Sequence, residues 1–180
     1  MYLRRLKDGD DIIKARKLAA LGIMLGLIFV LSVLEHLLPP IPFLPPNMRL
    51  GLANVVTMYS VFFIGKTAAL GLTAGKSAFV FMTRGPIAAM LSLGGGLLSV
   101  LAVILLVSVF KSRISYMLIG VISAILHNCG QMLVYSILAS TVGLLFYVPV
   151  LLVFGVVLGA ASGLVLKLVS NGLRGSRWRF

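Results

Sequence analysis

Long apolar runs, separated by short polar or proline-rich segments, dominate the pattern of the chain. A helix needs roughly 20 apolar residues to cross the hydrocarbon core of a bilayer, which is about 30 Å thick. The runs predict six such helices, of which the second and third are short. Their predicted ranges are 18–38, 50–65, 67–83, 86–110, 115–140 and 144–169. The pattern therefore predicts an all-α integral membrane protein with one six-helix transmembrane domain over residues 18–169.

The composition agrees with this prediction. Of the 180 residues, 60% are hydrophobic and 11% are charged, whereas a soluble domain is about half apolar and about a quarter charged. So few polar residues cannot cover a water-soluble core of this kind, which excludes an ordinary soluble enzyme, a secreted disulfide scaffold and a disordered tail. The single cysteine, Cys129, allows neither an internal disulfide nor a thiolate metal cluster.

The distribution of Lys and Arg predicts the orientation, because cytoplasmic loops carry the excess of these residues. Six spans with a cytoplasmic N-terminus put thirteen of the 16 basic residues inside. Five spans, with 50–83 as one tilted helix, would split the loop charges evenly between the two sides. The inner residues are Arg4, Arg5, Lys7, Lys14, Arg16, Lys17, Lys66, Lys111, Arg113, Lys167, Arg174, Arg177 and Arg179. We therefore expect both termini in the cytoplasm and a multi-pass protein of the inner (cytoplasmic) membrane.

The net charge of +12 is then mostly the signature of this orientation and of attraction to anionic lipid, not of nucleic-acid binding. We expect residues 1–17 to form a basic interfacial segment and residues 170–180 a basic cytoplasmic tail. The first apolar run is too long for a signal peptide and is followed by prolines rather than by a small-residue cleavage site, so we expect it to be retained.

The loop over residues 39–49 holds five of the seven prolines. Proline fixes φ and lacks an N–H, so this segment should be stiff, extended and non-helical. It is also apolar. Two interpretations remain open, a rigid connector and a lid over a cavity mouth.

Charged residues within or beside the spans are the first candidates for function, because ionisable groups are costly in a membrane. Lys76 lies near the middle of the third span and could pair with Glu35 or a helix C-terminus, or contact a ligand. Arg49 and Arg84 lie at outer ends of spans, as interfacial anchors or as parts of a cationic mouth; Arg84-Gly85-Pro86 predicts a tight turn. Glu35 could form an ion pair with either arginine.

Uncharged polar residues form a second group. Asn54 lies about one turn inside the second span, and His127, Asn128 and Gln131 cluster midway along the fifth. His127 and Gln131 are four residues apart and share a helix face. The cluster could bind a ligand or carry protons, or it could supply hydrogen bonds between helices.

Small residues recur at four-residue spacing, which lets helices approach closely, either within the protein or against another membrane subunit. They are Ala15 and Ala19, Gly22 and Gly26, Gly71 and Gly75, and Gly155, Gly159 and Gly163. No phosphate-binding loop, paired carboxylates, Asp-rich magnesium-binding run or metal-binding cluster is evident. We therefore expect no enzymatic activity, no metal and no cofactor.

Two motifs resemble those of a bacterial family. They are Met48-Arg49-Leu50-Gly51-Leu52-Ala53-Asn54 and His127-Asn128-Cys129-Gly130-Gln131, followed by a closing helix with Pro149 and Gly155. The family has two names, the Gx transporter family, related to the S components of energy-coupling factor (ECF) transporters, and heptaprenyl diphosphate synthase component I. The resemblance extends over residues 18–168.

The resemblance implies an S-component-like six-helix bundle that captures a small molecule from outside beneath the first loop. It implies partners as well, namely a membrane coupling (T) subunit and two ATP-hydrolysing subunits. Small residues on the first helix contact the coupling subunit in that family, which makes Ala15, Ala19, Gly22 and Gly26 the candidates here. The second family name implies the alternative, a membrane accessory component of polyprenyl diphosphate synthesis.

The main prediction is therefore the substrate-binding subunit of an ATP-driven importer. Its cavity would be lined by Glu35, Arg49, Asn54, Lys76, Arg84, His127, Asn128 and Gln131. Three cations against one acid favour an anionic or polar substrate, such as a carboxylate- or phosphate-bearing vitamin or quinone precursor. A prenyl diphosphate made in the cytoplasm would instead need its cations on the inner side, whereas Arg49 and Arg84 are predicted to lie outside.

Overall fold

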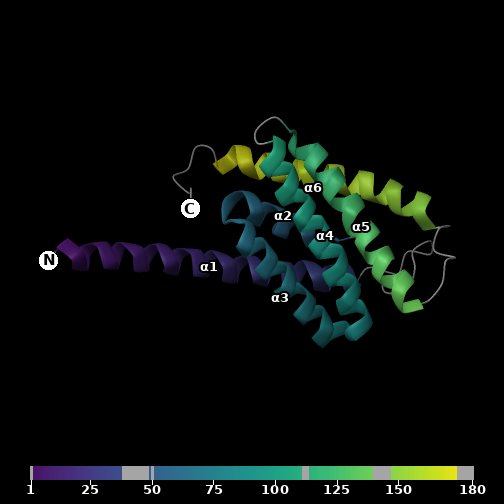
Figure 1. Ribbon diagram of the computed structural model, residues 1–180, viewed down its shortest axis with the longest axis horizontal. Helices are drawn as coiled ribbons and strands as arrows, with labels where there is room; N and C mark the ends of the chain where they lie inside the picture. The colour runs from purple at the N-terminus through teal and green to yellow at the C-terminus, as the bar shows by residue number, and fades with distance from the viewer. Residues whose placement is uncertain (1, 38–48, 50, 111–113, 140–146, 174–180) are drawn as a thin grey trace.

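The computed structural model describes residues 2–37, 49, 51–110, 114–139 and 147–173, with side chains from residue 12 to residue 172. Six α-helices follow one another along the chain (Figure 1). They are α1 (Tyr2–Leu37), α2 (Asn54–Phe63), α3 (Lys66–Arg84), α4 (Pro86–Phe110), α5 (Tyr116–Ala139) and α6 (Val148–Leu173). The predicted all-α fold with six helices is confirmed. Most of the proline-rich loop at 39–49 and of the tail at 170–180 lies outside the described residues.

Helix α1 is continuous over 36 residues, so the basic segment at 1–17 and the first span form one helix. The sequence has no proline before Pro39, and proline is the residue that most strongly breaks a helix, so a continuous helix can form over this stretch. The first half of α1 projects beyond the other helices (Figure 1).

Helix α2 has only 10 residues, or about 15 Å, which is half of the hydrocarbon thickness. It begins at Asn54 rather than at residue 50 because Gly51 has a φ of 80° and the Gly51 carbonyl accepts the Asn54 N–H at 2.9 Å. A second left-handed glycine, Gly65, separates it from α3. The predicted turn between α3 and α4 is formed by Gly85, with a φ of 86°, before Pro86 opens the next helix.

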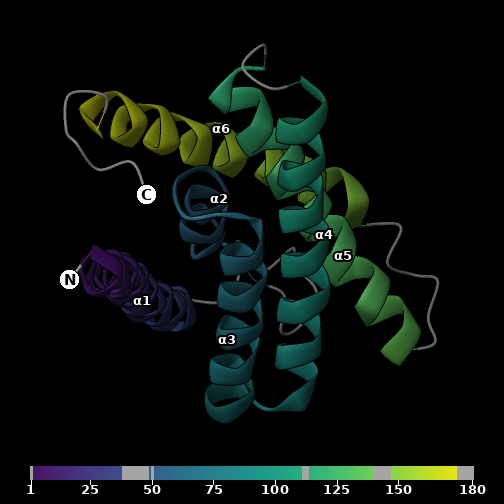
Figure 2. The same cartoon turned by 60° about the vertical axis from the view of Figure 1, so that its left-hand side comes forward.

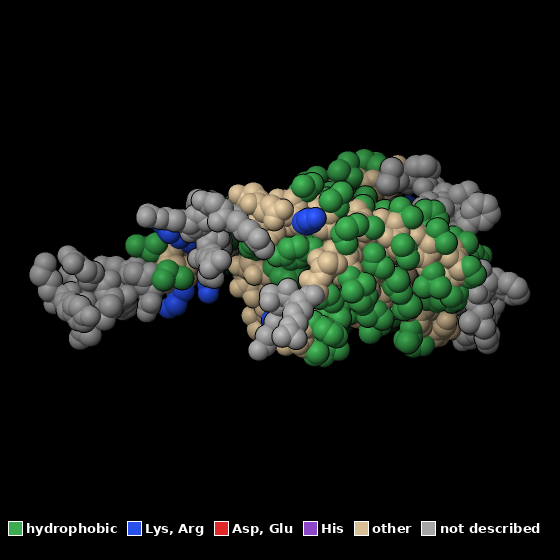
Figure 3. All heavy atoms as spheres, turned by 90° about the horizontal axis from the view of Figure 1, so that it is seen from above, with side chains coloured by type: hydrophobic (Ala, Val, Ile, Leu, Met, Phe, Trp, Pro, Cys, Tyr) green, Lys and Arg blue, Asp and Glu red, His purple; other side chains and the backbone are tan. Residues whose placement is uncertain are grey.

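Within the described residues, four helical segments are long and apolar enough to cross a membrane: Ile12–Leu37, Pro86–Phe110, Tyr116–Ala139 and Val148–Gly172. Large apolar side chains on these helices are exposed. The space-filling view shows one such face, covered mostly by hydrophobic side chains, with Lys and Arg gathered toward the projecting end of α1 (Figure 3). A surface of this kind is stable in lipid rather than in water, which indicates a multi-pass membrane protein.

Glycines bring α4, α5 and α6 into close contact. A Cβ at Gly130 would lie 2.8 Å from Gly95 Cα on α4, and a Cβ at Gly159 would lie 2.9 Å from the Val121 nitrogen on α5. A Cβ at Gly75 would lie 2.9 Å from Leu25 Cδ1 on α1. These positions confirm internal packing as one use of the small-residue spacing.

Other members of the same pattern do not pack inside the chain. At Gly22, Gly26 and Gly71 an added Cβ would meet nothing within 4 Å. Ala15 and Ala19 are exposed as well. The four-residue spacing therefore has two distinct uses, and the first helix presents its small residues outward.

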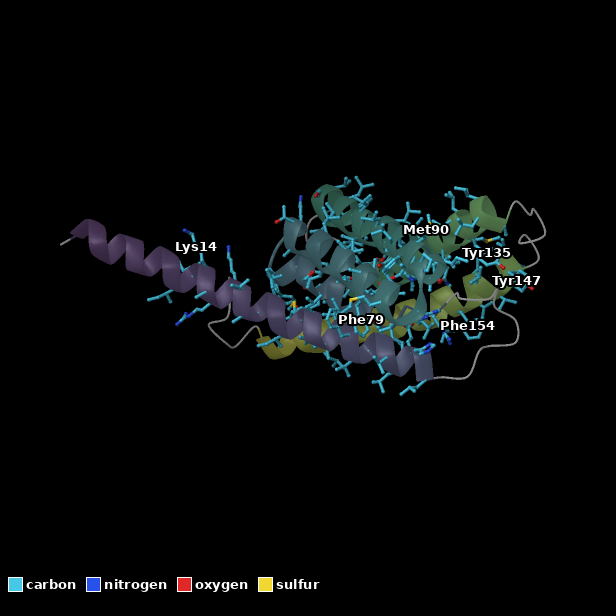
Figure 4. All side chains as sticks on the ribbon, turned by 90° about the horizontal axis from the view of Figure 1, so that it is seen from below. Lys14, Phe79, Met90, Tyr135, Tyr147 and Phe154 are labelled. Atoms are coloured by element: carbon cyan, nitrogen blue, oxygen red, sulfur yellow. The ribbon has the colours of Figure 1, made fainter. Side chains whose placement is uncertain are left out.

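Apolar clusters flank the polar centre of the bundle. One cluster includes Met58, Val103 and Leu166, and another forms around Leu91 and Leu151. Tyr135 and Tyr147 pack on the second cluster, at the end of the molecule opposite Lys14 (Figure 4). The buried polar residues of the bundle lie between the helices that these clusters hold together.

Candidate substrate-binding site

A small cavity of about 20 Å³ lies where α1, α3, α4, α5 and the turn before α2 meet. This volume corresponds to about one water molecule. Most of its lining is charged or polar. The lining residues are Ser32, Glu35, Arg49, Gly51, Lys76, Val80, Arg84, Ala88, Ser92, His127 and Gln131. Six of the eight residues predicted for the site thus share one cavity: Glu35, Arg49, Lys76, Arg84, His127 and Gln131.

Glu35 binds the irregular backbone before α2. Its carboxylate oxygen Oε1 accepts hydrogen bonds from the N–H groups of Gly51 and, at 2.9 Å, of Leu52. Non-helical backbone at membrane depth is stable only where its polar groups are satisfied inside the protein. Glu35 is 4% exposed, so one buried carboxylate both satisfies this turn and fixes the carboxyl end of α1 to it.

Gln131 holds the backbone of Arg49 in the same way. The Arg49 N–H donates to Gln131 Oε1 at 3.1 Å, and Gln131 Nε2 donates to the Arg49 carbonyl at 3.0 Å. Because the amide is used on both sides, its orientation is fixed by the two bonds. The role of Gln131 is therefore to position the segment that carries the Arg49 guanidinium to the cavity.

Lys76 contacts a partner that was not among the pairings predicted for it. Its Nζ donates to Asn54 Oδ1 at 2.8 Å, and the side chain is 4% exposed. Asn54 is not among the lining residues of this cavity, and the bond to Lys76 is its link to them. Glu35 is close enough to interact electrostatically with Lys76, but no hydrogen bond between them is found among the described residues.

His127 is held between two glycines. A Cβ on Gly51 would lie 2.8 Å from the ring Cδ2, and a Cβ on Gly95 would lie 2.8 Å from the ring Nδ1. Only glycine on both sides leaves room for an imidazole here. The ring is 2% exposed and lines the cavity, so α4 and the turn before α2 together determine where the histidine lies.

Three buried polar atoms of the cavity lining have no hydrogen-bond partner within the described part of the chain: Ser32 Oγ, Ser92 Oγ and His127 Nδ1. Buried polar atoms are hydrogen-bonded in the great majority of cases. Three exceptions around one cavity indicate a place where a polar molecule can supply the missing bonds. Sequence reasoning missed both serines, although Ser32 lies three residues before Glu35 on the same helix face.

Asn128 is the predicted site residue that the structure separates from the others. Its Nδ2 donates to the Leu151 carbonyl on α6 at 2.9 Å, and the residue does not line the cavity. Its observed contact is the helix–helix hydrogen bond that the sequence left open as the alternative. His127 and Gln131 face the cavity because they lie on the other side of α5.

The cavity is rich in positive charge. Lys76 and Arg84 lie on α3, Arg49 lies before α2, and Glu35 is the one acid among the lining residues. Both arginines are partly exposed, whereas Lys76 is buried. An enclosed group of cations, hydroxyls and an imidazole can bind an anion through charge and directional hydrogen bonds. In the described residues no group of three or more His, Cys, Asp or Glu side chains could hold a metal ion.

These features define a class, a helical membrane protein with a polar, cation-rich cavity enclosed by its helices. The fold is that of an S component. The chain is similar to a solved structure described as "Structure and mechanism of the S component of a bacterial ECF transporter", with a TM-score of 0.63 and 21% sequence identity. The similarity covers 89% of this chain and 96% of that one.

The chain belongs to the heptaprenyl diphosphate synthase component I family, whose family model matches residues 24–169. The resemblance inferred from the two motifs is thereby confirmed, both for the family and for the relation to S components. A comparison with curated proteins gave no match.

Proposed function

We propose that this chain is the substrate-binding membrane subunit of an ECF-type importer, which captures a small anionic molecule from the outer side. The observation that carries the proposal is the convergence of three cations and three unpartnered polar atoms on one cavity within an S-component-like fold. The substrate class is a carboxylate- or phosphate-bearing compound of the size of a vitamin or quinone precursor.

The small volume of the cavity limits how such a substrate can bind. At about 20 Å³ the site is far below the several hundred Å³ of typical ligand pockets. Binding must therefore widen it. The outer end of α1 and Arg49 are the parts that would move, and this movement would break the hydrogen bonds that Glu35 and Gln131 make to the backbone before α2.

The arrangement of the helix ends supports entry from outside. The amino end of α1 and the carboxyl end of α6 lie toward the same side of the molecule in both ribbon views (Figures 1 and 2). The start of α3 lies beside the end of α4, because Lys66 Nζ donates to Ser108 Oγ at 2.8 Å. Arg49 and Arg84 lie at the other ends of their segments. With the termini cytoplasmic, the two arginines face outward.

Energy for transport would come from partners, a membrane coupling subunit and two ATPase subunits. The exposed small residues of α1 support such a contact, because they let a neighbouring membrane helix approach closely. Those residues are Ala15, Ala19, Gly22 and Gly26, and at both glycines an added Cβ would meet nothing within 4 Å.

The family name favours a second candidate, an accessory role in heptaprenyl diphosphate synthesis. The cations of the cavity could hold a diphosphate. The lining of the cavity argues against a prenyl chain. Among the described lining residues, Val80 and Ala88 are the ones with apolar side chains, so the cavity offers little apolar surface. A prenyl substrate would need a long apolar channel continuous with the cations.

Native mass spectrometry of the purified protein tests the proposal. We expect a small polar anion to be retained, and we expect Ser92→Ala and Lys76→Met to reduce its occupancy. Ser170→Ala is the matched control, because Ser170 is also buried but bonds to Tyr116 at 3.1 Å, away from the cavity. Retention of a prenyl diphosphate, or equal retention by all three variants, would contradict the importer proposal.

A further inference from the structure

A second and larger hollow lies between α1 and the start of α3. Its volume is about 710 Å³, and it shares no lining residue with the substrate cavity. The lining residues are Lys17, Leu18, Leu21, Gly22, Leu25, Ile64, Thr67, Ala68, Gly71 and Leu72. We refer to it as the α1–α3 groove. The proposed function assigns no ligand to this groove, although one lining residue, Gly22, also belongs to the surface of α1 proposed to contact the coupling subunit.

The groove is closed at one end and open at the other. Leu25 packs on Gly75, and Phe29 stacks on Phe79 with ring centroids 4.2 Å apart, where α1 passes over the bundle (Figure 4). From this contact the two helices diverge toward Lys17 and Thr67. Between Leu25 and Lys17 the helix rises by about 12 Å. The groove is therefore a wedge that opens toward the end of α1 that leaves the bundle.

Glycines make the groove deep. At Gly22 on α1 and at Gly71 on α3 an added Cβ would meet nothing within 4 Å. The remaining wall is leucine, isoleucine and alanine, so it offers an apolar surface to whatever occupies it. The open end carries the polar groups, the Lys17 ammonium and the Thr67 hydroxyl. Lys14 and Arg16 are exposed on the same stretch of α1.

This distribution matches one kind of molecule, an apolar chain joined to an anionic head. A basic pocket between transmembrane helices at the cytoplasmic surface is the general setting in which proteins bind anionic lipid head groups. We infer that the α1–α3 groove binds one anionic phospholipid, with its phosphate at Lys17 and Thr67 and an acyl chain against Gly22 and Gly71. The lipid would fill the space that the divergence of the two helices leaves in the bilayer.

Two variants address the two halves of the lipid. Gly71→Leu places a side chain in the space of the acyl chain, and the helix tolerates it because the position is open and leucine favours helix more than glycine does. Lys17→Gln removes the charge. Each has a matched control on the same helix outside the groove lining, Ala74→Leu on α3 and Arg16→Gln on α1, both at exposed positions.

The experiment reconstitutes the full chain and the four variants in nanodiscs of phosphatidylcholine with a minor fraction of phosphatidylglycerol. Lipids that remain bound on release from the nanodisc are counted by native mass spectrometry. We expect one phosphatidylglycerol per chain, lost in Gly71→Leu and bound about fivefold more weakly in Lys17→Gln, the factor that corresponds to one basic residue near a membrane surface. Ala74→Leu should retain it, and Arg16→Gln, which removes a charge outside the groove lining, should weaken binding less than Lys17→Gln does.

The inference is wrong if phosphatidylcholine is retained equally well, if both controls lose the lipid as the test variants do, or if Gly71→Leu retains it. Thermal unfolding of each variant, monitored in parallel, ensures that a loss is counted only for folded protein. If Gly71→Leu does not fold, Gly22→Leu, on the other wall of the groove, replaces it with the same expected loss.

Discussion

Lys76 on α3 donates a hydrogen bond of 2.8 Å to the side-chain oxygen of Asn54, the first residue of α2. Both side chains are buried. This bond joins the short helix to the cationic side of the cavity, and it gives the ammonium a polar neutral partner while leaving its charge uncompensated by direct contact. A lysine held in this way is fixed in position and retains attraction for an anion.

The first prediction concerns the stability of this pair. Asn54→Leu should lower the free energy of unfolding more than Lys76→Met does. The first change leaves a buried ammonium without its partner, at a cost of about 3–5 kcal/mol, whereas the second leaves a neutral amide oxygen, at about 1–3 kcal/mol. Unfolding in detergent with increasing denaturant measures both. The double variant should be more stable than Asn54→Leu alone, and strictly additive losses would contradict direct coupling.

The second prediction concerns binding. Lys76→Met should remain folded and should bind the molecule that copurifies with the protein about 2–5 kcal/mol more weakly, as expected for truncating one side of a buried charged contact. Titration calorimetry with that molecule measures the affinity. Lys66→Met is the control, because Lys66 is exposed and bonds to Ser108 away from the cavity. Unchanged affinity in folded Lys76→Met would remove this lysine from the site.

The third prediction separates the charge of Glu35 from its hydrogen bonds. Glu35→Gln retains an oxygen that can accept from Gly51 and Leu52, whereas Glu35→Ala leaves both N–H groups buried without an acceptor. The alanine variant should therefore be less stable than the glutamine variant by about 1–3 kcal/mol. The melting temperatures of the two proteins in one detergent provide the comparison. Equal melting temperatures would show that the two backbone bonds contribute little.

Much of the fold follows from hydrophobic pattern, and the charged part of the site follows from the cost of ions in lipid. Lys76, Arg84 and His127 were predicted on that basis, and they line one cavity. The start of α2 could not be placed this way, because the apolar run continues through Gly51 and Leu52, where the chain turns instead. That turn depends on a glycine with positive φ and on Glu35, a contact between distant residues that no local pattern encodes.

The sequence also could not predict which residues contact one another within the site. Spacing shows that His127 and Gln131 share a helix face, but not which face points to the cavity. Asn128 lies next to His127 and faces α6 instead. The serines at 32 and 92 are unremarkable in an apolar helix, and only their place in the lining of one cavity shows that their hydroxyls have no partner among the described residues.

The fourth prediction concerns orientation. In a Cys129→Ala background, single cysteines at Asn47 and Pro86 should react with an impermeant maleimide from outside, and cysteines at Lys66, Ser112 and Asn171 only from inside. The expectation follows from the excess of basic residues near the second set of positions. Labelling of intact and opened cells distinguishes the two sides. Inside-only labelling at Pro86 would place the cavity mouth on the cytoplasmic face and would overturn the proposed direction of capture.

The fifth prediction uses two glycines with similar φ angles and different surroundings. Gly51 and Gly85 have φ angles of 80° and 86°, so alanine is strained at both by about 1–2 kcal/mol. A Cβ at Gly85 would meet nothing within 4 Å, whereas at Gly51 it would lie 2.8 Å from His127 Cδ2 and 2.9 Å from Asn54 Nδ2.

Gly51→Ala must therefore displace the histidine or the amide in addition to bearing the strain, and Gly85→Ala bears the strain alone. We expect both variants to lose stability, with the larger loss at Gly51, and we expect only Gly51→Ala to weaken ligand binding, because it moves two groups of the site. Melting temperature and ligand affinity, measured for both, test the two parts separately. Equal losses of stability together with unchanged affinity in Gly51→Ala would mean that the packing of His127 on this glycine does not determine the shape of the binding site.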